Sequence, residues 1–309
     1  MRALMLPERY DLIICGANFA GLALAFALHK AAEGTLRVGI LDRTAQIVPS
    51  TDLRAFAVSA ASVKLLTTLG LWPALEPGAQ AVSAIDITGG RLESPIRQHL
   101  LSYDNHTEFG EPASWIVPAE LLRATLVAAA NTAGFVISAS TIPSRLALSP
   151  TGIDLQCTDG RAFSARLLVA CDGRRSALRD LAGIKTVGWT YPQTAIITMV
   201  THSEPHNGRA RQHFLEAGPF AILPLPGGYR SSLVWSSAAA KQSVWWRSMM
   251  QASWPPSKNA LAASLGTSSS PGLAQRNLWK CIWRAASPQT VSSSLVMRQE
   301  ACTRLRARG

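Results

Sequence analysis

The sequence predicts an α/β fold in which an N-terminal βαβ unit is interleaved with a mixed β-sheet region. Two observations predict this class. A short apolar run at residues 10–15 is followed by a glycine-punctuated turn, an Ala- and Leu-rich helical stretch to about Ala32 and a second strand at 37–41. Farther along, residues 194–235 form a β-rich stretch with Gly and Pro at its turns. At 309 residues, the chain can hold two joined domains or one large α/β unit.

The elements between these two regions follow in order. Apolar residues recur at helical spacing over residues 54–69, and Gly70 is placed to end that helix. Further strands and one helix are expected at residues 84–88, 107–117, 118–130 (the helix), 135–138, 145–148, 153–158 and 166–170. We therefore expect a core over residues 1–183 with interleaved segments, a sheet over 184–238 and a tail over 239–309.

The formal charge of +11 is concentrated in the C-terminal tail. Residues 1–240 hold 20 Lys and Arg against 18 Asp and Glu, whereas residues 241–309 hold 10 basic residues and one acid, Glu300. The same tail contains five of the nine Trp. Because the main body is nearly neutral, the charge does not predict a nucleic-acid partner. Composition instead breaks near residue 240.

Cysteine and histidine spacing gives no sign of a metal site. The five scattered cysteines form no C-x-x-C pair and suit small core positions in a reducing compartment. The histidines, among them His202, His206 and His213, are expected in loops or on the surface. An apolar stretch at residues 12–28 follows Asp11 and is interpreted as strand, turn and helix rather than as a membrane segment.

The first constellation with chemical meaning is the G-x-N-x-x-G sequence of Gly16, Asn18 and Gly21. In a dinucleotide site the first glycine allows a tight turn, and the last allows helix and strand to pack closely. The N-terminus of the helix offers unpaired N–H groups to phosphates. Asp42 ends the second strand and is placed to accept hydrogen bonds from a ribose. Asn18 departs from the pattern because it adds a side chain where the cofactor should pass.

The second constellation follows an apolar strand. Asp172 and Gly173 come directly after it, and Ser176 and Arg179 lie on a helix expected to end near Gly183. An acid at the carboxyl end of a strand points into the crevice where open α/β sheets bind ligands. An ordinary Asx turn that caps a helix uses the same residue types. This segment by itself leaves both interpretations open.

Taken together, the motifs resemble the FAD-dependent aromatic hydroxylases. The matching features are the glycine motif, D-x-R-A at Asp52, Arg54 and Ala55 opening the next helix, and A-C-D-G-x-x-S-x-x-R. The string GPFAILPLPGGYRSSLVW at residues 218–235 is similar to the ubiquinone-biosynthesis branch. The resemblance covers residues 10–236. It implies a Rossmann-like FAD-binding core interleaved with a mixed β-sheet substrate region, incomplete at the C-terminus.

The resemblance also implies roles for the matching residues. The glycine motif and Asp42 would hold the ADP half of FAD, and Arg54 would lie beside the flavin and its ribityl chain. Asp172 and Gly173 would contact FAD near its pyrophosphate and help manage NAD(P)H. The flavin would carry the hydroxylation with O2, while the protein positions a phenolic ring and excludes water. No catalytic side chain is assigned, and no metal is expected.

The tail departs from what the resemblance implies. A third FAD element, containing Gly-Asp-Ala-Ala, His-Pro and Ala-Gly-Gln-Gly, is expected after the substrate sheet and is not found. Codons can be chosen for residues 296–309 that also encode a second peptide when the frame is shifted to start at the third base of each codon. That peptide is Asp-Ala-Ala-Arg-Gly-Met-His-Pro-Ile-Ala-Gly-Gln-Gly. The same frame turns residues 245–251 into Val-Ala-Leu-Asp-Asp-Ala. We therefore predict a frameshift between about residues 237 and 245 and a poorly ordered, out-of-frame tail. The alternative is a basic tail that binds an anionic membrane through Arg and Trp.

The resemblance thus implies an FAD- and NAD(P)H-dependent monooxygenase that hydroxylates a polyprenyl phenol in ubiquinone biosynthesis, represented by a truncated and impaired copy. A hydroxylase of another aromatic compound and a non-catalytic remnant with a partial nucleotide-binding core are the alternatives. The expected partner is a small aromatic substrate, with no nucleic acid and no transmembrane segment. We expect a cytoplasmic location, with peripheral contact to the inner membrane or to a ubiquinone-biosynthesis complex as an option.

Overall fold

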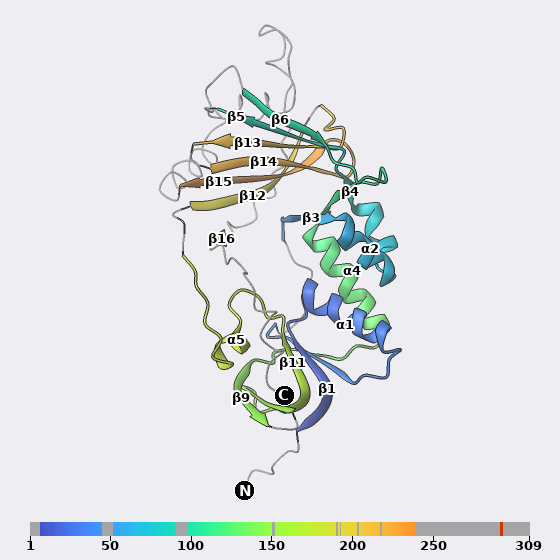
Figure 1. Ribbon diagram of the computed structural model, residues 1–309, viewed down its shortest axis with the longest axis vertical. Coiled ribbons are helices and arrows are strands. Elements are labelled where there is room, and N and C mark those ends of the chain that lie inside the picture. The colour runs from blue at the N-terminus through green and yellow to red at the C-terminus, as the bar shows by residue number, and fades with distance from the viewer. Residues whose placement is uncertain are drawn as a thin grey trace.

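The described chain forms two sheet-based regions with helices along one side between them (Figure 1). The computed structural model describes residues 7–44, 52–90, 98–149, 152–189, 191, 193–202, 204–216, 218–238 and 291–292. The predicted out-of-frame tail therefore lies outside the described residues, apart from the two-residue strand β16 (Val291–Ser292). The predicted α/β class is confirmed.

The first region is a six-stranded sheet in the order β8-β2-β1-β11-β10-β9. Its first four strands run parallel, and the last two are antiparallel additions. The strands are β1 (Glu8–Cys15), β2 (Val38–Leu41), β8 (Ile137–Ser138), β9 (Pro143–Ser149), β10 (Gly152–Cys157) and β11 (Ala162–Ala170). The chain moves from β1 outward to β2 and β8, then crosses to β11 on the other side of β1. Such a reversal of strand order places a ligand crevice at the carboxyl ends of β1 and β11.

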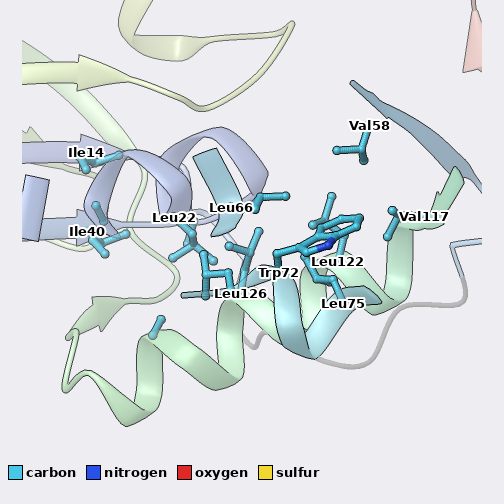
Figure 2. Packing of buried hydrophobic residues seen from close by; sticks show 14 of the residues in the cluster. Ile14, Leu22, Ile40, Val58, Leu66, Trp72, Leu75, Val117, Leu122 and Leu126 are labelled. Carbon is cyan, nitrogen blue, oxygen red and sulfur yellow. The ribbon is translucent and has the colours of Figure 1, made fainter. Parts of the chain in front are cut away.

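Helices cover one face of this sheet and enclose the largest core. Leu22, Trp72 and Leu126 come from three different helices and pack over the parallel strands at Ile14 and Ile40 (Figure 2). The helices on this face are α1 (Phe19–Ala31), α2 (Ala60–Thr68), α3 (Trp72–Leu75), the 3-10 turn η1 (Glu76–Gly78) and α4 (Ala119–Thr132). The short helix α5 (Ala177–Leu181) lies on the opposite face, where Leu178 packs with Ile13 and Leu41. Burying such side chains contributes about 1.5–3 kcal/mol each, so this core supplies much of the stability of the first region.

The second region is a seven-stranded sheet in the order β16-β12-β15-β14-β13-β5-β6. Strands β5 (Ala84–Gly89) and β13 (Arg209–Leu215) pair in parallel, and the other pairs are antiparallel. The remaining strands are β6 (Gln98–Asp104), β12 (Gln193–Thr201), β14 (Gly218–Leu225) and β15 (Arg230–Ala238). An early hairpin thus joins strands that come more than a hundred residues later.

A small three-stranded sheet connects the two regions. Its order is β3-β7-β4, with β3 (Ala55–Ser59), β4 (Gln80–Ala81) and β7 (Ser114–Pro118). The buried side chains of Val82 and Ile116 from this part pack against Ala210 and Leu225 of the seven-stranded sheet. The regions are therefore joined through an apolar contact.

Two predicted elements need correction. The helix predicted over residues 54–69 is wrong at its start, because the chain first forms β3 and α2 begins only at Ala60. Pairing with β7 holds the first residues extended, and the Ser59 hydroxyl accepts the N–H of Ser62 to cap the helix. The strand predicted over residues 107–117 is also wrong in its first half, since β7 begins at Ser114. Among the described residues, no helix is long and apolar enough to cross a membrane.

Candidate functional site

The candidate site begins with a glycine turn at the carboxyl end of β1. Gly16 has φ +110°, and a Cβ at this position would come within 2.3 Å of the Cys171 carbonyl oxygen. At Gly21, in the first turn of α1, a Cβ would come within 1.8 Å of the Gly16 oxygen. The Gly16 N–H donates to Leu41 O at 2.7 Å, which ties the turn to the end of β2. Backbone from three segments thus meets where a side chain has no room.

Asn18 caps the helix that follows the turn. Its φ is −109°, and its side-chain oxygen accepts the N–H of Phe19 at 2.9 Å. This backbone conformation does not require glycine, and the side chain is exposed. Asn18 therefore replaces the second glycine of the motif with a residue type that favours the N-cap position.

Asp42 lies beside the same turn. One carboxylate oxygen accepts the N–H of Ala17 at 2.7 Å, and the other accepts the N–H of Thr44 at 2.7 Å. Each oxygen has a second lone pair, so the carboxylate can still accept from a ligand hydroxyl. The predicted proximity of Asp42 to the glycine motif is thus present in the structure.

Asp172 approaches the turn from the carboxyl end of β11. Its Oδ2 accepts a long bond from Leu178 N at 3.4 Å, while Oδ1 is buried and accepts no hydrogen bond from any described residue. The N-cap of α5 is Ser176, whose hydroxyl accepts Arg179 N at 3.0 Å. Helix capping therefore engages only Oδ2 of Asp172 and leaves Oδ1 unexplained. A buried carboxylate oxygen without a donor is costly unless a ligand supplies one.

Gly173 follows Asp172 and is exposed to solvent. Its φ is +89°, and a Cβ there would meet nothing within 4 Å. The glycine is needed for the backbone conformation and not for close packing.

Arg54 reaches the site from a different direction. Its Nε donates to both carboxylate oxygens of Asp52 at 2.8 and 2.9 Å, and its Nη2 donates to Oδ2 at 2.6 Å. The guanidinium carbon lies 5.5 Å from the centre of the Phe56 ring, which packs edge-on against Phe19 at 5.1 Å. We call the turn at Gly16 and Gly21, together with Asp42 and Asp172, the cradle. Because Phe19 is the first residue of α1, Arg54 is linked to this cradle through two aromatic rings.

The pairing of Asp52 with Arg54 shifts the pKa of both groups. Burial alone would raise the pKa of Asp52, but the hydrogen bonds from Arg54, with help from the charge of Arg123, lower it. The hydrogen bond to Asp52 raises the pKa of Arg54. Both groups are therefore charged at neutral pH.

The expectation that the histidines lie in loops or on the surface is wrong for His213, which is buried within β13. His202 and His206 lie in the loop between β12 and β13, as expected, but they are buried as well. His202 Nε2 lies 3.0 Å from Ser231 Oγ, His206 Nε2 lies 2.8 Å from Leu225 O, and His213 Nδ1 lies 2.8 Å from the Thr88 hydroxyl. No group of three or more His, Cys, Asp or Glu among the described residues could hold a metal ion.

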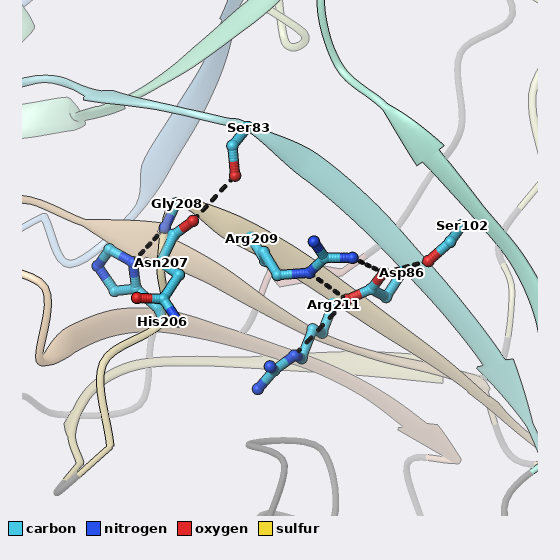
Figure 3. Close-up of polar contacts among 8 residues, drawn as sticks. All are labelled: Ser83, Asp86, Ser102, His206, Asn207, Gly208, Arg209 and Arg211. Carbon is cyan, nitrogen blue, oxygen red and sulfur yellow. Dashed lines mark hydrogen bonds and ion pairs between the residues drawn. The ribbon is translucent and has the colours of Figure 1, made fainter.

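A second polar cluster lies on the seven-stranded sheet. Arg209 makes two hydrogen bonds to Asp86, at 2.7 and 2.9 Å, and Ser102 donates to the same carboxylate (Figure 3). Arg211 Nε lies 3.8 Å from Asp86. The hydrogen bond from Arg209 lowers the pKa of Asp86, whereas burial lowers the pKa of Arg211. This cluster ties β5, β6 and β13 together and lies outside the nucleotide cradle.

A match to a family model shows which family the chain belongs to. The family model described as FAD binding domain matches residues 9–289, which is most of the chain. The chain belongs to the FAD binding domain family. The matched range continues beyond the change in composition near residue 240.

Two proteins that are similar to this chain in sequence carry names from ubiquinone biosynthesis. Ubiquinone hydroxylase UbiL of Rhodospirillum rubrum is 37% identical over 229 residues, covering 73% of this chain and 51% of that protein. The mitochondrial ubiquinone biosynthesis monooxygenase COQ6 of Rattus norvegicus is 28% identical over 245 residues, 75% of this chain and 51% of COQ6. The predicted resemblance to the ubiquinone-biosynthesis hydroxylases is confirmed. The chain spans about half the length of these relatives.

A solved structure supports the fold. PqsL of Pseudomonas aeruginosa in complex with 2-aminobenzoylacetate superposes with a TM-score of 0.66 at 19% identity, covering 84% of this chain and 72% of PqsL. At this identity the likeness concerns the fold alone.

The cradle fits the cofactor of the FAD binding domain family. A phosphate chain needs close backbone approach and N–H donors, which the glycine turn and the start of α1 supply. A ribose needs an acceptor, and the Asp42 carboxylate lies beside the turn. The buried Asp172 Oδ1 needs a donor that the described residues do not provide.

Sequence reasoning missed the residues that hold Arg54. The sequence assigned Asp52 to a motif without indicating that it pairs with Arg54. Arg123, whose charge helps to lower the pKa of Asp52, comes from the distant helix α4. The ring contact between Phe19 and Phe56 joins segments 37 residues apart. A signal for Asp52 was present, because the five-residue pattern around it occurs a second time in the chain.

Proposed function

We propose that this chain represents an FAD- and NAD(P)H-dependent monooxygenase that hydroxylates a polyprenyl phenol in ubiquinone biosynthesis, with O2 as co-substrate. The observation that supports this most is the convergence of Gly16, Asp42 and Asp172 at one edge of the parallel sheet. It occurs in a chain similar to proteins named as ubiquinone hydroxylases. Because the chain spans about half of those relatives, activity and substrate are proposed for the lineage.

The ADP half of FAD is proposed to lie against the glycine turn. Gly16 and Gly21 would leave the pyrophosphate room beside α1, and Asn18 would flank it from the N-cap position. Asp42 would accept hydrogen bonds from the ribose hydroxyls with its remaining lone pairs.

The flavin half is proposed to lie toward Arg54 and Asp172. Arg54 would donate to FAD oxygens, and Asp172 with Gly173 would contact the cofactor near its pyrophosphate. FAD, when bound, would supply the redox chemistry that uses NAD(P)H and O2 to hydroxylate the ring. The chain positions the ring and excludes water, and we assign no catalytic side chain.

The substrate wall is proposed to come from the seven-stranded sheet, in particular β14 and β15. We propose the division into a core over residues 1–183 with interleaved segments, a substrate sheet over 184–238 and an out-of-frame tail over 239–309. Among the interleaved segments, β5 and β6 join the seven-stranded sheet. Because a polyprenyl phenol partitions into lipid, we also propose peripheral contact with a membrane. The frameshift between about residues 237 and 245 is part of this proposal, supported by the composition of the tail.

The test uses a bacterial strain that lacks its own ubiquinone hydroxylase. Two versions of the gene are introduced, one as given and one with the reading frame restored near codons 237–245, and quinone intermediates are measured by mass spectrometry. We expect the restored version to supply ubiquinone, and the version as given to bind FAD only weakly and to leave an under-hydroxylated phenol.

Each other outcome contradicts a named part of the proposal. If neither version converts the phenol, the lineage acts on another aromatic compound or is a non-catalytic remnant. If both versions convert it, the tail is not an impairment. Coding DNA in which no one- or two-base change opens the alternative frame would show that the frameshift prediction is wrong.

A further inference from the structure

The pentapeptide D-x-R-A-F occurs twice, at residues 52–56 and 159–163. Both copies fold alike and lead into a strand, β3 or β11. In each copy the Asp accepts the backbone N–H of the Arg at 3.0 Å and also holds its guanidinium. The guanidinium carbon lies 5.5 Å from the Phe ring centre in the first copy and 5.9 Å in the second. The local sequence therefore builds the same device twice.

The two copies differ in what the guanidinium does with its remaining donors. In the second copy, Arg161 Nη2 donates to Ala139 O at 2.9 Å and to the Thr141 hydroxyl. In the first copy, Arg54 uses Nε and Nη2 on Asp52, and its Nη1 donates to no residue that the structure describes. A guanidinium carries five N–H donors, so Arg54 presents an open donor edge.

The open edge lies near the nucleotide cradle. The Arg54 guanidinium stacks on Phe56, and Phe56 packs against Phe19 at the start of α1. The Arg54 side chain is 41% exposed, whereas that of Asp52 is 13% exposed. The carboxylate is thus the fixed member of the pair, and the guanidinium is the accessible one.

We propose that Asp52 is a positioning residue for dinucleotide binding. It holds Arg54 through a bidentate pair so that the Nη1 edge, which donates to none of the described residues, donates to a phosphate oxygen of FAD. A guanidinium that is already oriented loses less side-chain freedom when the anion binds. Arg54 is the group that would touch the cofactor, and Asp52 acts through it. This inference rests on the proposed function, because it needs FAD as the ligand.

The test is a set of FAD titrations of the full chain, followed by flavin fluorescence. We expect Asp52→Asn, which keeps the shape but loses the charge, to weaken FAD binding about fivefold to tenfold. Arg54→Leu should weaken it at least as much. In the double variant Asp52→Asn/Arg54→Leu, the loss should equal that of Arg54→Leu alone, because Asp52 has no guanidinium left to position.

The second copy of the pentapeptide supplies the matched control. Asp159→Asn removes the same carboxylate charge from the same local structure, and we expect FAD affinity within about twofold of the unsubstituted chain. Urea unfolding of Asp52→Asn and Asp159→Asn separates lost binding from lost folding, since both break a comparable pair.

Three results would overturn the inference. Equal weakening by Asp52→Asn and Asp159→Asn would reduce Asp52 to a structural role. If the double variant bound FAD more weakly than Arg54→Leu by the full effect of Asp52→Asn, then Asp52 would not act through Arg54. Both leave the proposed function standing, whereas a chain with the restored reading frame that binds no FAD at millimolar concentration removes the proposed function as well.

Discussion

Gly21 lies inside a helix, where alanine normally forms helix better than glycine by about 1 kcal/mol. At this position alanine is expected to destabilise the chain instead. A Cβ would come within 1.8 Å of the Gly16 oxygen, a backbone atom that cannot move aside without disturbing the turn. The G-x-N-x-x-G pattern identified this position, and the closeness of the two backbone segments explains it. Asn18 in the same pattern needs no glycine because its φ is negative.

We predict that Gly21→Ala lowers the free energy of unfolding by about 2 kcal/mol or more, as overpacking does. The measurement is urea unfolding followed by circular dichroism. Gly188→Ala is the matched control, since a Cβ there meets nothing within 4 Å, and its change should stay within about 0.5 kcal/mol. A Gly21→Ala chain as stable as the unsubstituted one would show that α1 can shift away from the turn.

At the scale of elements, the parallel pairing of β5 with β13 depends on an ion pair that bridges 123 residues. The sequence predicted strands at both places without indicating that they are neighbours. Local pattern sets which segments are extended, whereas pairing between distant strands is set by complementary side chains and by packing. The start of α2 shows the same limit, because pairing with β7 overrides the helical spacing before Ala60.

We predict that Asp86→Asn destabilises the chain by about 1–2 kcal/mol at neutral pH, because Arg209 and the half-buried Arg211 lose their counter-charge. Hydrogen bonding from Arg209 lowers the folded-state pKa of Asp86, so its contribution is complete above about pH 4 and is lost as pH falls through the lowered pKa. The difference in the free energy of unfolding between the unsubstituted chain and Asp86→Asn should therefore disappear at acid pH. Urea unfolding at several pH values measures it.

Asp104→Asn is the control for that experiment. Asp104 lies on the adjacent strand β6, its side chain is 77% exposed, and its ion pair with His106 is at the surface. We expect its effect to stay below about 1 kcal/mol. If the loss caused by Asp86→Asn persisted unchanged at low pH, the ion pair would not be its source.

At the scale of the whole molecule, the two sheet regions are held together by a small apolar contact. Leu225 on β14 is 2% exposed and packs with Val82, Ile116 and Ala210, which come from three other segments. The proposed nucleotide cradle lies in one region and the proposed substrate wall in the other. Their relative position therefore depends on this contact.

We predict that Leu225→Ala costs about 2–4 kcal/mol and makes the two regions unfold at different urea concentrations. Tryptophan fluorescence and far-UV circular dichroism, recorded on the same samples, would then give separate transitions. Leu148→Ala, at a 77% exposed position on β9, should leave stability nearly unchanged. Coincident transitions and a loss under about 1 kcal/mol would show that the contact does not couple the regions.

The sequence by itself determined the α/β class, the βαβ unit with its glycine turn, the position of Asp42 beside that turn and the family. These features depend on residues close together in the chain, and their conformational requirements can be read from local pattern. The tertiary structure decided which strands pair across the chain, why three histidines are buried, and which donor of Arg54 is left open. Those features depend on contacts between segments as far apart as β5 and β13, and local pattern does not encode such contacts.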